Sequence, residues 1–356
     1  MSTVPYRLGF AVKVLGADEP LKEADSRRWQ SGPHLRTSLA YLERIWDHLE
    51  RIDVRMYRMS STVIPYGSHQ GLPEFDYRRQ IDECADALTA LGDRTKSLGL
   101  RLSLHPGQYT VINGADPDLR DRSLLELEAN AGLLDALGCG QEATVVVHVG
   151  GLYGDRTSAL DRWAAAWELL SEGARRRVGL ENDERLFTLD DVLELHRRTG
   201  VRVVYDHHHA RINPSPELIG ADALRAAFST WPHGVRPKVH LSSPRLSVET
   251  VRRPVPGTRR RRDVTVPPPL GPHADLVSPW DFLDLVHAAP GPLDVMLEAK
   301  AKDVALLWLR RKLVSLAPDV AAAEECPSPT GAAPRAPAGR PRPPGRPAGP
   351  ARVGRE

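Results

Sequence analysis

Eight short β-branched runs, separated by longer stretches of helical pattern, limit most strongly how this chain of 356 residues can fold. Several runs are apolar at consecutive positions, as in VVVH before Val149 and VVYD before His207. Such continuous apolar runs are typical of strands buried on both faces of a parallel sheet. The expected strands are Arg7–Val12, Arg55–Met59, Arg101–Leu104, Thr144–His148, Val178–Leu180, Val201–Tyr205, Lys238–Leu241 and Asp294–Leu297.

The stretches between these runs carry apolar residues at helical spacing. The expected helices are Leu35–Leu49, Tyr77–Leu98, Leu119–Leu137, Ala159–Glu172, Leu189–Thr199, Pro216–Phe228, Pro279–Val286 and Val304–Leu316. Eight strands that alternate with eight helices predict a (β/α)8 TIM barrel. An open doubly wound sheet is the alternative. No glycine-rich phosphate turn follows the first strand, which argues against a Rossmann fold, and we expect no nucleotide cofactor.

Two segments depart from this alternation. Pro244–Pro272 is a long connection that contains Arg252, Arg253 and the run Arg259–Arg262. Connections of this length in a compact domain are usually functional or disordered. Residues 321–356 are rich in proline, alanine, glycine and arginine, and they bury too little apolar surface to offset the entropy of ordering. We therefore expect a barrel domain over residues 1–320, followed by a disordered tail.

Composition narrows the class of protein. The formal net charge of +2 does not by itself indicate a nucleic-acid partner. The three cysteines, Cys84, Cys139 and Cys326, are scattered and odd in number, which argues against a disulfide framework. The N-terminus lacks the pattern of a signal peptide, and no stretch approaches the roughly 20 apolar residues of a membrane helix. These features predict a cytoplasmic protein with no membrane partner.

Histidines and carboxylates stand at the ends of six consecutive expected strands. They are His105, His148, Glu181, Asp206 with His209 just beyond it, His240 and Glu298. In a TIM barrel the carboxyl ends of all strands open on one face, so these residues converge in one pocket. Imidazole nitrogens and carboxylate oxygens are the ligand mixture of Zn, Mn or Fe sites. Because unpaired acids would repel one another there, the pattern predicts an enzyme that holds two or more divalent metal ions.

Ordered motifs extend this prediction. They are RLGF (Arg7–Phe10), YRMSS (Tyr57–Ser61), YGSH (Tyr66–His69), LHPGQYTVIN (Leu104–Asn113), VVVHVGG (Val145–Gly151), LENDE (Leu180–Glu184), YDHHH (Tyr205–His209), KVHLSS (Lys238–Ser243), HADLV (His273–Val277) and MLEAKAKD (Met296–Asp303). In this order and combination the chain resembles the UV damage endonuclease family of DNA repair enzymes. The resemblance runs from about Tyr6 to Leu316 and so covers the whole expected barrel.

The resemblance implies a barrel related to endonuclease IV that holds up to three divalent metals, most often manganese, with magnesium or zinc as alternatives. It implies incision of damaged double-stranded DNA immediately 5′ of UV photoproducts and other distorting lesions. Carried over by position, the metal ligands are His105, His148, Glu181, Asp206, His209, His240, His273 and Glu298. Glu181 is our candidate for a bridging ligand. His69 should lie beside the first metal, and Lys238 should face the cluster, either carboxylated as a ligand or cationic against a phosphate.

The same resemblance assigns residues to the damaged duplex. Gln108 and Tyr109, on the loop after the third strand, would enter the gap left by the displaced bases, where an aromatic ring replaces lost stacking. Phe10 stands where many family members have tyrosine, and we expect it to line the lesion pocket and to influence which lesions are accepted. Arginines of the basic connection, among them Arg260 and Arg261, can neutralise backbone phosphates.

Two other functions stay open from the residues alone. A metal-dependent sugar isomerase or epimerase on the same barrel would use similar ligands, but fewer of them and no wedge at the rim. A protein that binds damaged DNA without cutting would show no metal-dependent cleavage. Barrels host many chemistries, so the fold cannot separate these functions. Our hypothesis is metal-dependent phosphodiester hydrolysis that leaves a 3′-hydroxyl and a 5′-phosphate, performed by a monomer associated with the nucleoid.

Overall fold

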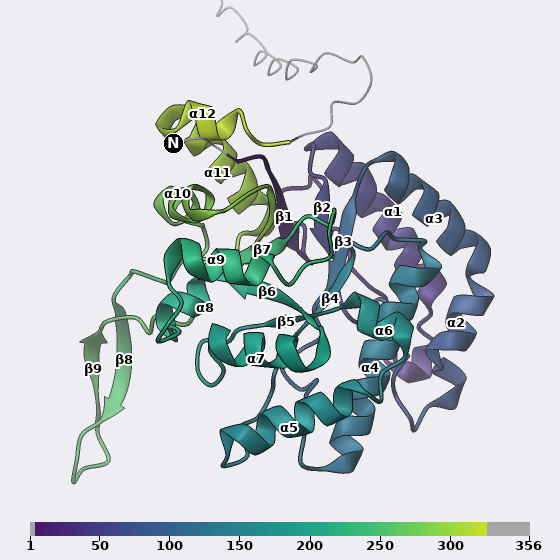
Figure 1. The fold of residues 1–356 in the computed structure, drawn as a ribbon, viewed down its shortest axis with the longest axis horizontal. Coiled ribbons are helices and arrows are strands. Elements are labelled where there is room, and N and C mark those ends of the chain that lie inside the picture. Colours follow the sequence, from purple (N-terminus) through teal and green to yellow (C-terminus); the bar gives the residue numbers. More distant parts are fainter. Residues whose placement is uncertain (1–3, 326–356) are drawn as a thin grey trace, which may run out of the picture. The chain divides into compact units, whose positions relative to one another are not determined.

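Eight parallel strands close into a barrel in this computed structural model, which describes residues 4–325 (Figure 1). The strands follow the order β1-β10-β7-β6-β5-β4-β3-β2, and the pairing of β1 with β10 closes the ring. Their bounds are β1 (Tyr6–Ala11), β2 (Met56–Arg58), β3 (Arg101–Leu104), β4 (Thr144–His148), β5 (Val178–Glu181), β6 (Arg202–Asp206), β7 (Lys238–Leu241) and β10 (Leu293–Leu297). The expected TIM barrel is confirmed, and each strand lies within two residues of its predicted bounds.

Helices surround the barrel. They are α1 (Leu35–Arg51), α2 (Tyr77–Glu83), α3 (Ala85–Ser97), α4 (Pro117–Ala136), α5 (Arg156–Trp167), α6 (Glu172–Arg177), α7 (Leu189–Thr199), α8 (His207–Ile212), α9 (Gly220–Phe228), α10 (Pro279–Ala288), α11 (Lys302–Leu316) and α12 (Pro318–Ala321), with two 3-10 turns at Trp29–Ser31 and Pro73–Phe75. The apolar stripe of α1 faces inward, and its Trp46 is fully buried and donates from Nε1 to Thr95 Oγ1 of α3 at 2.8 Å. Burial of such a stripe between helix and strand stabilises each helix, since a short helix alone is marginal in water.

Two expected helices are each interrupted. The stretch Tyr77–Leu98 breaks at Cys84, where the backbone leaves the helical region (φ −115°, ψ 12°), and it forms α2 and α3. The stretch Ala159–Glu172 ends at Trp167, and a second helix starts at Glu172, where Ser171 accepts a capping hydrogen bond from the Ala174 backbone. Apolar spacing continues through both breaks, so the periodicity alone did not reveal them.

A buried ion-pair network lies in the barrel near the amino-terminal ends of the strands. The fully buried Asp294 carboxylate accepts from Arg7 Nη2 and from Arg101 Nη1, both at 2.6 Å. Burial alone would raise the pKa of Asp294, but the charges and hydrogen bonds of the two guanidinium groups lower it. Paired charges therefore stabilise the amino-terminal end of the barrel. This network does not extend to the carboxyl-terminal end, where the strand-end histidines and carboxylates lie.

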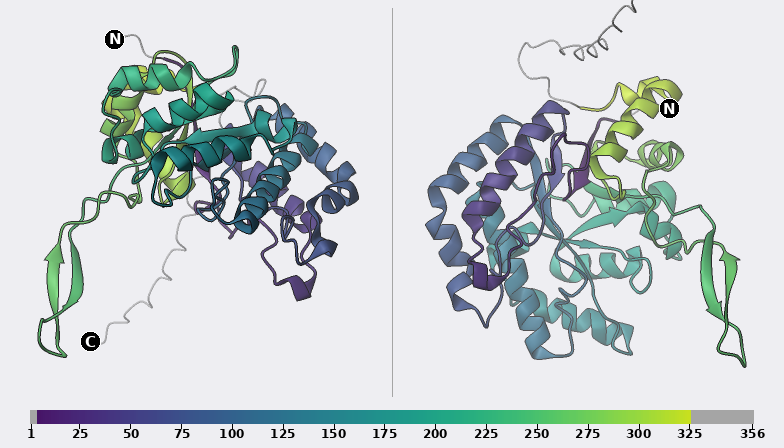
Figure 2. Two further views of the ribbon diagram at one scale, coloured as in Figure 1. Left: turned by 60° about the horizontal axis from the view of Figure 1, so that its bottom comes forward. Right: turned by 180° about the vertical axis from the view of Figure 1, so that it is seen from behind.

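The long basic connection is not an irregular loop. It contains an antiparallel hairpin of β8 (Glu249–Pro254) and β9 (Arg261–Val266), which extends away from the barrel (Figures 1 and 2). Val264 and Val266 alternate along β9, and Val251 of β8 lies opposite Val264. This strand pattern was not recognised in the sequence because arginines dominate the segment.

The first residues assigned to the tail are part of the barrel unit. The Tyr6 and Glu324 backbones form a β-bridge, and Glu324 accepts from Arg310 at 2.6 Å. The rest of the expected tail, residues 326–356, lies outside the described residues. Over residues 4–325, no helix is long and apolar enough to cross a membrane.

Candidate metal centre

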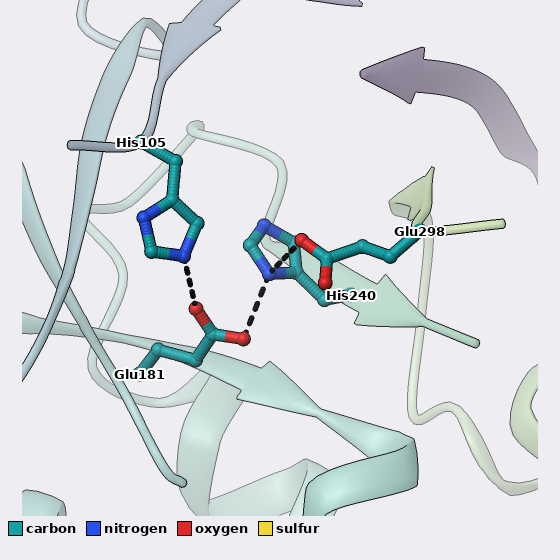
Figure 3. Close-up of side chains that lie close together, drawn as sticks. All are labelled: His105, Glu181, His240 and Glu298. Atoms are coloured by element: carbon teal, nitrogen blue, oxygen red, sulfur yellow. Dashed lines mark hydrogen bonds and ion pairs between the residues drawn. The ribbon is translucent and has the colours of Figure 1, made fainter. Parts of the chain in front are cut away.

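Four residues from four different strands meet at the carboxyl-terminal face of the barrel. His105 follows β3, Glu181 ends β5, His240 lies in β7 and Glu298 follows β10, and one potential ligand atom of each lies within 4.8 Å of the others (Figure 3). Glu181 stands at the centre: its Oε2 is 3.0 Å from His105 Nε2 and its Oε1 is 2.9 Å from His240 Nδ1. Side chains separated by up to 193 positions in sequence therefore form one polar cluster.

A second group shares Glu181 with the first. It consists of Glu181, Asp206 and His209, again with ligand atoms within 4.8 Å of one another. Asp206 Oδ1 accepts from the His209 backbone at 2.7 Å, which caps α8 and turns the His209 ring toward the cluster. One fully buried carboxylate that belongs to two ligand groups has the position expected of a bridging ligand between two cations.

Asn182 orients this second group. Its Oδ1 accepts from the Asp206 backbone N–H at 2.9 Å and its Nδ2 donates to the Asp206 carbonyl oxygen at 3.1 Å. The backbone carbonyl oxygen of Asn182 is 3.0 Å from His209 Nδ1. Partners of this kind fix ligand orientation in metal sites. We did not single out Asn182 from the sequence, although it lies in the LENDE motif.

The donor atoms fit divalent cations. Asp206 Oδ2, His240 Nε2 and His148 Nδ1 are buried without a hydrogen-bond partner among the described residues. Burial lowers the pKa of His105 to about 4 and so favours the neutral imidazole that metals require. Burial alone would raise the pKa of Glu181, but His240 and His148 hold it well below its usual range. A neutral imidazole beside an ionised carboxylate is a suitable pair of metal ligands.

His148 and His273 lie beside the two groups without joining them. His148 Nε2 is 3.7 Å from Glu181 Oε2, and its ring centroid is 5.2 Å from that of His105. His273 Nδ1 is 2.8 Å from the Glu298 carbonyl oxygen. Its ring centroid lies 6.1 Å from that of His209. All eight residues that the resemblance proposed as ligands therefore gather at this face.

Two basic side chains, Lys238 and Arg58, approach the cluster from inside the barrel. Lys238 is fully buried, and its Nζ donates to Ser103 Oγ at 3.0 Å. Burial, together with Arg58 and Arg101, lowers the pKa of Lys238 well below its usual range. Arg58 Nη1 donates to Glu298 Oε1. Arg58 was missed in the sequence, where only its place in the YRMSS motif pointed to it.

The residues expected at the rim are exposed. Tyr109 is 81% exposed and follows Gln108 on the loop after β3. His69 lies on the loop after β2 and lines a cavity of about 520 Å³ together with Tyr109. It belongs to neither ligand group, and its ring faces that of Tyr66 with a centroid distance of 6.3 Å.

Phe10 is not at the site. Its side chain is fully buried in the core between the barrel and the helices, and its ring packs edge-on against that of Tyr57 at a centroid distance of 5.4 Å. Because strand side chains alternate, this position of β1 faces away from the barrel axis. The expectation that Phe10 lines a lesion pocket does not fit this placement.

The chain is similar to known proteins over this whole region. The family model described as UV-endonuclease UvdE matches residues 34–324. The UV DNA damage endonuclease of Bacillus pumilus is 31% identical over 268 residues, which cover 74% of this chain and 76% of that protein. That of Bacillus cereus is 28% identical over 283 residues, or 79% and 82% of the two chains.

Solved structures agree. The crystal structure of SacUVDE superposes with a TM-score of 0.69 at 26% identity, covering 87% of this chain and 99% of that one. Endonuclease IV from Thermus thermophilus shares the fold, with a TM-score of 0.50 at 18% identity over 87% and 99% of the two chains. The family match spans the strands that supply every residue of both ligand groups. This chain belongs to the UV-endonuclease UvdE family of DNA repair endonucleases.

Proposed function

We propose that the protein incises damaged double-stranded DNA immediately 5′ of UV photoproducts and other distorting lesions, by metal-dependent hydrolysis of the phosphodiester. The observation that carries this proposal is Glu181, a fully buried carboxylate shared by two ligand groups. The exposed Gln108 and Tyr109 line a cavity together with His148, which lies beside these groups. A sugar epimerase would need neither the second ligand group nor an aromatic side chain projecting from the rim.

The ligand groups would hold two or three divalent cations, with manganese favoured over magnesium and zinc. When bound, such cations lower the pKa of water and neutralise charge on the phosphate. His105, His240 and Glu298 would form one site, and Asp206 with His209 the other, with Glu181 between them. Their separate strands hold the ligand atoms in fixed positions before substrate arrives, so little reorganisation is needed.

The side chains around the ligands have their own roles. Arg58 orients Glu298 through its ion pair and keeps that carboxylate charged. Lys238 lies two positions before His240 on the same strand, so both side chains face the barrel interior. If cationic, the Lys238 ammonium would bind a phosphate oxygen, and if carboxylated it would become a further ligand. His69, exposed near Tyr109, would contact the strand that is cut.

Gln108 and Tyr109 supply a reason why damage is chosen. The exposed ring can replace stacking lost at a displaced lesion, and the amide can hydrogen-bond the bases left unpaired. Opening the duplex costs least where pairing is already damaged, so the same wedge selects against intact DNA.

The arginine-rich hairpin would bind phosphates of the flanking duplex. Arg253 lies directly opposite Arg262, and Arg260 and Arg261 are exposed toward its tip. Like charges directly opposite each other destabilise a two-stranded ribbon, and an anion between them would relieve this repulsion. Phosphate contacts give affinity without sequence preference. We propose that the protein acts as a monomer in the cytoplasm, at the nucleoid.

A nicking assay tests the function. Purified protein is incubated with UV-irradiated or untreated supercoiled plasmid, in manganese, magnesium, zinc or a chelator. We expect nicking of irradiated plasmid with at least one metal and none in the chelator, and sequencing gels should place the cut 5′ of the dimer. Equal inactivity on both plasmids with every metal would refute the proposal. Binding of irradiated DNA without nicking would favour a damage-binding protein.

A further inference from the structure

We propose that Tyr153, on the loop between β4 and α5, is a second aromatic residue of the DNA interface and forms a wall of a cavity that takes a nucleobase displaced from the duplex. This inference rests on the proposed function. It adds a binding site for an unstacked base on the β4–α5 loop, which has no role in the function proposed above.

The cavity lies next to the candidate metal centre. It has a volume of about 450 Å³, and its lining includes Gln108, Tyr109, Tyr153 and the candidate ligand His148. This volume falls in the range of ligand pockets and exceeds what a single base needs. A base that Gln108 and Tyr109 displace from the stack would therefore find an open space beside them.

Tyr153 is held in a conformation that non-glycine residues rarely adopt. Its φ is 50°, and the flanking Gly150 and Gly154 have φ values of 111° and 91°. A left-handed conformation costs a non-glycine residue about 1 kcal/mol or more, and such strain gathers at functional sites. One side of the ring packs against Gly151 so closely that a Cβ there would lie 2.5 Å from Tyr153 Cε2. Tyr153 as a whole is nevertheless 48% exposed, so burial does not explain the strain.

Arg162 of α5 supports the ring. Its guanidinium carbon lies over the ring, 5.3 Å from the centroid, and its Nε donates to the Asn113 carbonyl oxygen at 3.0 Å. A cation over one face of a tyrosine fixes the ring by electrostatic attraction to its π-electrons. Arg162 and Gly151 hold the ring in place, and about half of the residue stays exposed to receive a base.

Asn113 joins the Tyr153 loop to the Gln108–Tyr109 loop. Asn113 is fully buried; its Nδ2 donates to the Gly151 carbonyl oxygen at 2.8 Å, and its Oδ1 accepts from the Gly151 backbone at 3.1 Å. Because Asn113 belongs to the same loop as Tyr109, these two hydrogen bonds fix the two aromatic residues relative to each other. The wedge and the proposed platform therefore form one unit.

The chemistry of the lining indicates a base. The tyrosine ring offers stacking, which every base accepts, and Gln108, Glu184 and Arg185 supply an amide, a carboxylate and a guanidinium for the polar edges. The stacked base can be one of the damaged pair or its orphaned partner on the other strand. Both have the same stacking chemistry, and the experiment separates them.

The test compares Tyr153→Leu and Tyr153→Phe with wild type in the metal-loaded protein. Fluorescence anisotropy gives Kd for duplexes that contain one pyrimidine dimer, with phosphorothioate linkages at the incision site to slow cleavage. A second duplex carries abasic residues opposite the dimer, and a third is undamaged. Tyr41→Leu on α1 is the matched control, because Tyr41 also has a cation over its ring but lies outside this cavity.

We expect Tyr153→Leu to weaken binding of the dimer duplex by roughly 5- to 150-fold, the range that stacking of one base implies. Tyr153→Phe and Tyr41→Leu should bind as the wild type does, and binding of undamaged DNA should be unchanged. If the abasic residues remove the effect, Tyr153 stacks an orphaned base; if the effect persists, it stacks a damaged one.

If folded Tyr153→Leu binds both dimer duplexes as tightly as the wild type does, and the wild type nicks irradiated DNA, the inference about Tyr153 is refuted while the proposed function stands. Circular dichroism checks whether Tyr153→Leu is folded. If it is not, Tyr153→Ser replaces it, and wild-type affinity of Tyr153→Ser for both dimer duplexes would refute the inference in the same way. Failure of the wild-type protein to nick irradiated DNA would instead refute the proposed function and remove the displaced base on which the inference depends.

Discussion

Replacing Glu181 by glutamine should abolish most nicking without unfolding the barrel. The substitution keeps the shape of the side chain but removes the charge that the two ligand groups share. Glu181 makes two close contacts, at 2.9 Å with His240 and at 3.0 Å with His105. Removal of one preorganised electrostatic group from an active site typically costs about 3–4 kcal/mol, or roughly 10²- to 10³-fold in rate, and Glu181 serves two ligand groups, so we expect a loss of roughly 10²- to 10⁴-fold.

The assay is the initial rate of nicking of UV-irradiated plasmid with the preferred metal. Metal content after dialysis provides a second measurement, and it should fall in Glu181→Gln. The matched control is Glu324→Gln, which removes another largely buried glutamate, paired with Arg310 outside both ligand groups. The control should lower stability but keep the wild-type rate at 25 °C. A folded Glu181→Gln protein that nicks within about threefold of wild type would refute the bridging role, because a difference of about 0.7 kcal/mol is too small for the loss of a shared ligand.

Two further predictions concern the hairpin and the ion-pair network. The double variant Arg253→Ala, Arg262→Ala should weaken binding of damaged and undamaged DNA equally, and it should reduce the slope of log K against log salt by about 2, as measured by fluorescence anisotropy. An unchanged slope would exclude phosphate contacts by these two arginines. Arg225→Ala on α9 is the control. Asp294→Asn should cost about 3–5 kcal/mol in urea unfolding at pH 7, because it leaves the buried guanidinium group of Arg101 without its carboxylate. Since the folded-state pKa of Asp294 is lowered, its contribution is complete above the ordinary value of 3.8 and is lost as the pH falls through the folded-state pKa. The stability difference between Asp294→Asn and wild type should therefore narrow in acid, and parallel pH curves would contradict the role of this carboxylate.

Local pattern determined the architecture of this protein. Strand positions could be predicted because strands buried on both faces carry uninterrupted apolar runs, as in β4 and β6. Once the barrel is expected, the face on which strand ends gather follows from its topology. His105, Glu181 and His240 could therefore be proposed as neighbours from sequence alone, and the structure brings them together. His273, which follows no strand, depended on the family resemblance.

Contacts between distant side chains depended on the tertiary structure. The ion pair of Arg58 with Glu298 joins residues 240 positions apart and exists only because β10 and β2 flank β1 in the closed ring. Phe10 was assigned to the wrong side of β1, because the amino-acid sequence does not reveal which face of this strand points toward the barrel axis. A two-residue period marks two faces of a strand but not which one is inside.

The sequence by itself determined the barrel, the strand ends and the chemical types of the ligands, since these follow from hydrophobic period and residue chemistry. Only the tertiary structure decided that Glu181 is shared by two ligand groups, because that depends on ångström-scale distances. The tertiary structure also decided the strained backbone conformation of Tyr153, because Asn113 and Arg162, from other segments of the chain, hold the Tyr153 loop and ring. Loop conformation is set by such distant partners rather than by local propensity, so no sequence period records it.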